Sequence, residues 1–111
     1  MDRRKDARYV VLFRTTYSSP KRESGEGSLL DISLHGCRLS TAGTLESGKE
    51  LILHLYPPGT IIRIEARAIV RWAKEGEVGL EFVDVPYEDA KALHDLVGAL
   101  EKAGLNQESV A

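Results

Sequence analysis

Two arginines four residues apart, Arg4 and Arg8, stand near the start of the sequence, and Arg3 comes directly before them. Guanidinium groups pair bidentately with phosphate oxygens and with the O6 and N7 edge of guanine, and they also stack on base faces. A ligand that carries both phosphate and guanine would use each of these modes. Taken alone, however, a basic run at an N-terminus is more often a solvated tail.

A second polar group, Asp31-Ile-Ser33-Leu-His-Gly36, follows about twenty residues later and interrupts a run of apolar residues. A carboxylate such as that of Asp31 can accept hydrogen bonds from the N1–H and amino groups of guanine, and the hydroxyl of Ser33 suits a phosphate or a neighbouring arginine. Gly36 permits a close backbone approach to a ligand or a positive φ. Arg38 follows closely enough to touch the same ligand. The alternative is ordinary turn chemistry, in which these side chains satisfy local backbone groups.

The sequence lacks the patterns of common catalytic and metal sites. It has no Gly-x-Ser-x-Gly elbow and no glycine-rich phosphate loop. The three histidines fall in three different segments, with no cysteine or carboxylate at metal-ligand spacing. The single cysteine, Cys37, is expected to be a small buried hydrophobe. We therefore predict a protein that is not an enzyme and that has no metal or cofactor.

Size and charge narrow the function further. A chain of 111 residues with 42% hydrophobic content suits one domain. Its apolar runs are too short for a membrane helix or a signal peptide, so we expect a cytoplasmic protein without membrane insertion. The net charge of −2 hides an asymmetry: residues 1–22 carry seven basic and two acidic side chains, whereas residues 77–111 carry eight acidic and two basic ones. This distribution favours a local anion site over a general polyanion-binding surface.

The elements that must position these residues are mainly strands. Six segments are rich in β-branched, aromatic or alternating apolar residues: 8–18, 28–33, 36–41, 50–56, 60–72 and 78–85. Polar turns are predicted between them at 19–27, 41–49 and 74–77. The clearest alternation places six apolar residues on one face of 60–72, namely Ile62, Ile64, Ala66, Ala68, Val70 and Trp72. Six strands at hairpin spacing predict a mostly antiparallel small barrel or sandwich.

The outer residues of the same segment have two readings. Arg63, Arg67 and Arg71 either extend a positive surface around the site or belong to a solvated face, and we favour the second because Glu65 lies among them. Trp72 is expected in the core or at the end of the barrel rather than as a platform for stacking a base.

The pattern changes period after Pro86. An apolar stripe with helical spacing predicts an amphipathic helix over residues 86–103 that covers an end or open side of the barrel; it consists of Leu93, Leu96, Val97 and Leu100. The chain then divides into a flexible arginine-bearing segment (1–8), one domain (8–104) and a tail (105–111).

Arg4-x-x-x-Arg8 followed by Asp31-x-Ser33-x-x-Gly36 resembles the two-part signature of PilZ domains. Trp72 and the Gly-Leu-x-Phe stretch at 79–82 resemble the end of that family's barrel. The resemblance covers roughly residues 2–103. It implies a mainly β fold, a six-stranded antiparallel β-barrel with a C-terminal α-helix, and binding of the bacterial second messenger cyclic di-GMP.

The resemblance also implies roles for individual residues. Arg4 and Arg8 match the paired arginines that grip phosphate and guanine edges, and Arg3 matches an arginine that stacks on or clamps the dinucleotide. Asp31 and Ser33 match the polar pair that fixes a guanine and its neighbouring groups. Gly36 matches the glycine that lets the strand turn beneath the ligand.

These observations predict a bacterial cyclic di-GMP receptor whose N-terminal arginine segment becomes ordered on binding. Because no effector domain is recognised in the chain, we expect a separate protein partner to read that change. The main alternative is a PilZ-like protein–protein adaptor with little or no nucleotide affinity, against which the intact signature argues. A nucleic-acid-binding barrel is a third possibility. The acidic C-terminal third and the scarcity of exposed aromatic residues count against it, so no nucleic-acid partner is expected.

Overall fold

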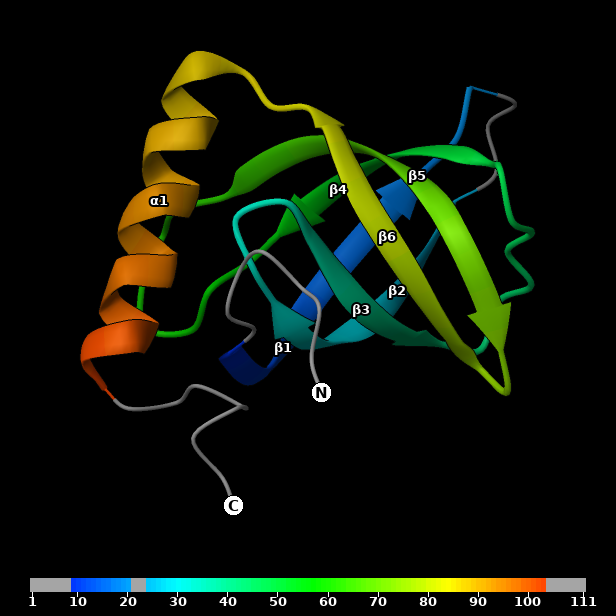
Figure 1. Cartoon of the computed structure of the whole chain (residues 1–111), viewed down its shortest axis with the longest axis horizontal. Coiled ribbons are helices and arrows are strands. Elements are labelled where there is room, and N and C mark those ends of the chain that lie inside the picture. Colours follow the sequence, from blue (N-terminus) through cyan, green and yellow to red (C-terminus); the bar gives the residue numbers. More distant parts are fainter. Residues whose placement is uncertain (1–8, 21–23, 104–111) are drawn as a thin grey trace, which may run out of the picture.

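The computed structural model describes residues 9–20 and 24–103, which form a closed six-stranded barrel and a helix (Figure 1). The elements are β1 (Tyr9–Ser18), β2 (Ser24–Ile32), β3 (Gly36–Thr41), β4 (Glu50–Leu55), β5 (Ile64–Lys74), β6 (Glu77–Asp84) and α1 (Tyr87–Lys102). The strand order is β1-β2-β3-β6-β5-β4, and β4 pairs in turn with β1 to close the barrel. Every pairing is antiparallel. The predicted fold class is therefore confirmed.

The core follows the period-2 pattern of the sequence. In β4, Leu51, Leu53 and Leu55 are fully buried and alternate with partly exposed Ile52 and His54. The first half of β5 behaves in the same way, since each second residue from Ile64 to Val70 points inward. Successive side chains of a strand leave opposite faces of the sheet, so this alternation fills the barrel on one side and meets solvent on the other.

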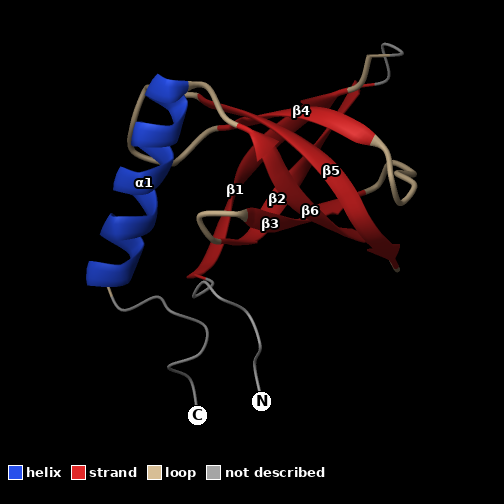
Figure 2. Ribbon diagram, turned by 45° about the horizontal axis from the view of Figure 1, so that its top comes forward, coloured by secondary structure: helices blue, strands red, loops and turns tan. Residues whose placement is uncertain are grey.

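Helix α1 lies at one side of the barrel, as Figure 2 shows. Leu93 and Val97 of the predicted apolar stripe are buried in the common core, and Leu96 and Leu100 pack partly against it. The backbone N–H of Glu65 donates a 2.8 Å hydrogen bond to Oδ1 of Asp89, which ties the start of β5 to the first turn of the helix. No helix within the described residues is long and apolar enough to cross a bilayer.

Three predicted boundaries are wrong, and each error has a local cause. The polar turn expected at 19–27 ends earlier, because β2 already begins at Ser24. A Cβ on Gly27 would collide with the backbone carbonyl of Ser40, so this glycine serves close strand packing rather than a turn.

The strand predicted at 60–72 starts only at Ile64, and Ile62 is exposed rather than part of the core face. The hydroxyl of Thr60 accepts a hydrogen bond from the N–H of Ile62 and donates one to the carbonyl of Pro57, at 3.0 and 3.4 Å. These hydrogen bonds hold residues 57–62 in a local turn, so the strand begins only after it.

The hairpin between β5 and β6 is also tighter than the predicted turn at 74–77. Lys74 ends β5 and Glu77 begins β6, so only Glu75 and Gly76 connect the strands. Both have positive φ, of 53° and 80°, as a two-residue hairpin turn requires. Glu77 is thereby placed in a strand. The proposed division into a segment 1–8 and a tail 105–111 stays a prediction, since those residues lie outside the described ranges.

Candidate ligand-binding site

The Asp-x-Ser-x-x-Gly motif forms the hairpin between β2 and β3. The backbone N–H of Ser33 donates to the carbonyl of Gly36 at 2.9 Å. The Ser33 hydroxyl donates to the same carbonyl and accepts from the N–H of His35, both at 3.3 Å. Ser33 is buried, so its hydroxyl fixes the turn, and the local backbone bonding weighed above is present. A hydroxyl has two acceptor lone pairs, and the turn uses one of them.

Gly36 is required for a reason that the sequence did not suggest. The glycines with positive φ in the described part of the chain are Gly48, Gly59 and Gly76, so the positive-φ alternative for Gly36 is wrong. A Cβ on Gly36 would instead collide with the backbone carbonyl oxygen of Leu80 on β6. The glycine therefore allows β3 to approach β6 closely at the start of their pairing.

Arg38 is the cation that this hairpin presents. Asp31 and Arg38 are cross-strand partners on β2 and β3, and Nε of Arg38 donates to Oδ2 of Asp31 at 3.1 Å. The Asp31 side chain is only 3% exposed, whereas that of Arg38 is 33% exposed. A charge-assisted hydrogen bond to a buried carboxylate restricts the guanidinium to one orientation while part of it still reaches solvent. This arrangement suits recognition of an anion.

Arg38 has a second partner that the sequence analysis missed. Its Nη1 donates to Oε1 of Glu77 on β6, also at 3.1 Å. Glu77 lies 39 positions along the chain, in a segment read as a turn, and only the β3–β6 pairing brings it to this place. We find no signal in the single sequence that could have identified it.

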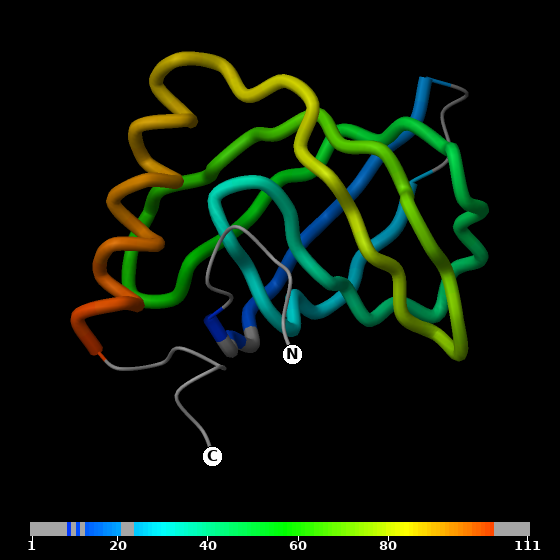
Figure 3. The backbone as a smooth tube through the Cα atoms, viewed as in Figure 1, coloured from blue at the N-terminus to red at the C-terminus, as the bar shows by residue number. Residues whose placement is uncertain are grey.

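Arg3, Arg4 and Arg8 lie outside the described residues, so their side chains are not placed. The first described residues nevertheless locate the point where this segment joins the barrel. Tyr9 pairs with Ile32, and β1 begins beside the β2–β3 hairpin (Figure 3).

Covalent geometry then limits how far the arginines can lie from the motif. Consecutive Cα atoms are about 3.8 Å apart, so Arg8 starts one such step from Tyr9. Arg4 is five residues from Tyr9 and can be at most about 18 Å away, at roughly 3.6 Å per residue. The structure thus brings Asp31, Ser33, Gly36 and Arg38 together, and its first described residue, Tyr9, lies beside them.

The remaining outer arginines resemble a solvated face more than an extended site. Each of three pairs with a glutamate, and the partners are Arg14–Glu26 at 3.3 Å, Arg67–Glu50 at 3.1 Å and Arg71–Glu81 at 2.6 Å. All six side chains are about half exposed. Pairs of this kind contribute little to stability and neutralise the positive charge locally.

Trp72 lies on the outer face of the barrel, not in its core. Its indole covers Gly79, where any side chain would collide with the ring. The β5–β6 register shifts between Val70 and Trp72, and an extra residue in one strand exchanges the inward and outward positions that follow. The predicted core alternation therefore fails at this end of β5. Trp72 is 40% exposed. Only β6 separates it from Arg38, because Gly79 of β6 pairs with both residues.

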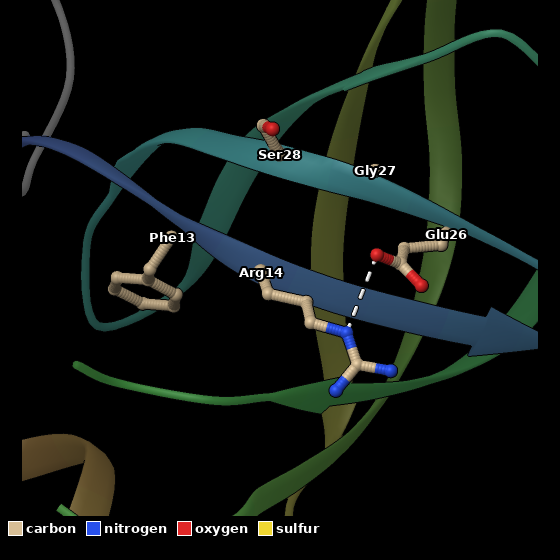
Figure 4. Close-up of a pocket in the computed structure, with 5 residues that line it drawn as sticks. All are labelled: Phe13, Arg14, Glu26, Gly27 and Ser28. Atoms are coloured by element: carbon tan, nitrogen blue, oxygen red, sulfur yellow. Dashed lines mark ion pairs between the residues drawn. The ribbon is translucent and has the colours of Figure 1, made fainter.

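A hollow of about 480 Å³ lies on the outer face of β1 and β2, away from the motif (Figure 4). It is lined by Phe13, Arg14, Glu26, Gly27 and Ser28. The Arg14 guanidinium lies 4.9 Å from the ring centroid of Tyr56 and pairs with Glu26, so it already has two partners. None of the motif residues lines this hollow.

Comparison with known proteins agrees with this geometry. The model of the PilZ domain family matches residues 2–99. A search of curated protein sequences gives no significant match. Because the family match covers most of the chain, it establishes the family independently of the structure.

Three solved structures illustrate the shared fold. The inhibitor of motility MotI/DgrA from Bacillus subtilis superimposes with a TM-score of 0.74 at 21% identity, over 96% of this chain and 53% of that one. The PilZ domain of YcgR from Escherichia coli, solved with c-di-GMP, gives 0.73 at 14% identity over 99% and 100%. The MrkH–c-di-GMP complex from K. pneumonia gives 0.75 at 16% identity over 94% and 54%.

The chain thus spans about half the length of the Bacillus protein and of MrkH, and all of the YcgR domain. At these identities the structures support the fold, and the family match establishes the family. Together they show that the chain belongs to the PilZ domain family.

Proposed function

We propose that this PilZ domain is a receptor for cyclic di-GMP. The observation that carries the proposal is Arg38, an accessible guanidinium held by the buried carboxylate of Asp31 at the hairpin where β1 begins. Two of the structural relatives are described with this dinucleotide bound. A ligand with two phosphates and two guanines matches the donors that Arg38 and the N-terminal arginines offer.

The residues then divide into two groups. Arg38 contacts the ligand from the barrel, and Asp31 acts mainly by holding Arg38, since its own side chain has little exposed surface. Ser33 and Gly36 keep the hairpin in the shape that presents them. Arg3, Arg4 and Arg8 supply the remaining guanidinium groups from the segment before Tyr9.

We further propose that ligand binding fixes residues 1–8 against the β2–β3 hairpin and that a protein partner reads this change in the cytoplasm of a bacterium. Hydrogen–deuterium exchange with and without cyclic di-GMP tests the first step. Slower exchange confined to the N-terminal segment and the hairpin is expected, and unchanged exchange in residues 1–8 would contradict it.

Isothermal titration with cyclic di-GMP tests the central proposal, with GTP as the control ligand. Saturable heat is expected for cyclic di-GMP, and Arg8→Ala is expected to weaken binding at least tenfold, because a charge-assisted hydrogen bond contributes roughly 1.5–3 kcal/mol. No heat at high micromolar ligand would overturn the proposal and favour the adaptor alternative.

A further inference from the structure

The second carboxylate on Arg38 has no place in the Asp-x-Ser-x-x-Gly motif. Glu77 lies at the start of β6, and its side chain is 39% exposed, in contrast to the almost fully buried Asp31. Arg38 therefore bridges one buried and one exposed acid, on the two strands that flank β3. Asp31 already orients the guanidinium through Nε. The function of the additional exposed partner thus requires an explanation.

The position of Glu77 on the guanidinium matters for ligand binding. An arginine grips an anion most strongly when two parallel N–H groups meet two oxygens. Nε already donates to Asp31, so the edge formed by Nη1 and Nη2 remains for such a bidentate pair. Glu77 accepts from Nη1, one of the two nitrogens that form this edge. An anionic ligand that uses the edge meets the Glu77 carboxylate there.

The negative charge of Glu77 also disfavours the binding of an anion at Arg38. With its carboxylate ionised, Glu77 offsets part of the positive charge that Arg38 presents to a phosphate. Lys74 faces Glu77 across the β5–β6 pairing, and Gly79, opposite Arg38, adds no charge. Because Glu77 is partly solvated, it can leave Arg38 at small energetic cost, whereas the buried Asp31 cannot.

We propose that Glu77 competes with the ligand's phosphate for Arg38 and thereby sets the affinity of the domain. The inference rests on the proposed function, because it concerns the same site. Glu77 would then weaken ligand binding, although it contacts Arg38, the residue that promotes binding.

Isothermal titration of the full chain and its Glu77→Gln variant with cyclic di-GMP tests this inference. Glutamine keeps the length of the side chain and an acceptor oxygen but removes the charge. The dissociation constant is expected to fall about three- to fivefold, which is the upper part of the contribution of a partly exposed ion pair.

Glu50→Gln is the matched control. Glu50 pairs with Nε of Arg67 at 3.1 Å and is similarly exposed, but it lies on β4, which does not neighbour β3 in the barrel. Its affinity is expected to stay within twofold of the parent protein. Thermal unfolding of all three proteins verifies that they fold.

The outcomes separate the two proposals. Binding by the parent protein with unchanged or weaker binding by Glu77→Gln would overturn the inference and leave the receptor function intact. Equal tightening in Glu50→Gln would overturn it too, because the effect would then be one of net charge alone. No heat from any of the three proteins would overturn the proposed function and the inference with it.

Discussion

Arg38 and Arg14 both lie on the outer face of the barrel and both pair with a carboxylate, but the carboxylates differ in burial. The Asp31 side chain beside Arg38 is 3% exposed, whereas Glu26 beside Arg14 is 59% exposed. Arg14 itself is 58% exposed and Arg38 33%. A surface pair of the Arg14 type exchanges readily with water and contributes about 0.2–1 kcal/mol. The pair at Arg38 fixes the guanidinium before any ligand arrives.

The difference shows that a hollow and a binding site need not coincide. A hollow lies at Arg14, yet the polar groups of Arg14 and Glu26 that line it are exposed and paired with each other. The Arg38 region offers a cation that is oriented by a buried acid, and orientation in advance lowers the entropy lost on binding. This is why we place the ligand at Arg38.

Removing the acid from each pair provides the largest contrast in stability. Asp31→Ala is expected to lower the free energy of unfolding by roughly 1.5–3 kcal/mol, because Arg38 loses a charge-assisted hydrogen bond in a partly buried place. Glu26→Ala is expected to change it by no more than about 1 kcal/mol. Urea unfolding of both variants measures the difference. Equal losses would show that burial of the acid does not distinguish the two regions.

The hairpin that carries the motif offers the next test. Gly36→Ala is expected to destabilise the protein by about 1–3 kcal/mol, because the new methyl group collides with the Leu80 carbonyl and separates β3 from β6. Gly98 in α1 is the control, since a Cβ there meets no atom within 4 Å. Gly98→Ala is expected to stabilise the helix by about 0.5–1 kcal/mol. Thermal melts that order the two variants the other way would contradict the packing account of Gly36.

The smallest effect is expected beneath the Arg14 region. The hydroxyl of Thr15 is fully buried and has no hydrogen-bond partner among the described residues, whereas the equally buried Asp31 is paired. Thr15→Val is therefore expected to stabilise the protein by about 1 kcal/mol, because the desolvation of an unpaired hydroxyl is removed. The melting temperature should rise by a few degrees. A fall in melting temperature would indicate that the hydroxyl is bonded in solution.

Local patterns in the sequence were enough to predict most of the fold. The alternation of Leu51, Leu53 and Leu55 identified β4, and the spacing of Leu93 and Val97 identified the buried face of α1. These signals work because burial repeats with the period of the element. They fail where a register shift changes the phase, which is why the inward alternation predicted for β5 does not extend to Trp72.

The candidate site was predictable in its members but not in its contacts. The spacing of Asp31, Ser33 and Gly36 indicated a hairpin with polar side chains, and Arg38 was added because it follows directly. The role of Glu77 depends on the pairing of β3 with β6, two strands far apart in sequence. Such pairing is set by the closure of the whole barrel, so no local pattern contains it.

The most direct test of the account compares the two arginines in one experiment. Isothermal titration with cyclic di-GMP is carried out on the parent protein, Arg38→Ala and Arg14→Ala. At least a tenfold loss of affinity is predicted for Arg38→Ala, from a lost charge-assisted contact, and a change of less than twofold for Arg14→Ala. Loss of binding in Arg14→Ala with unchanged binding in Arg38→Ala would contradict the account and move the ligand to the hollow along β1 and β2.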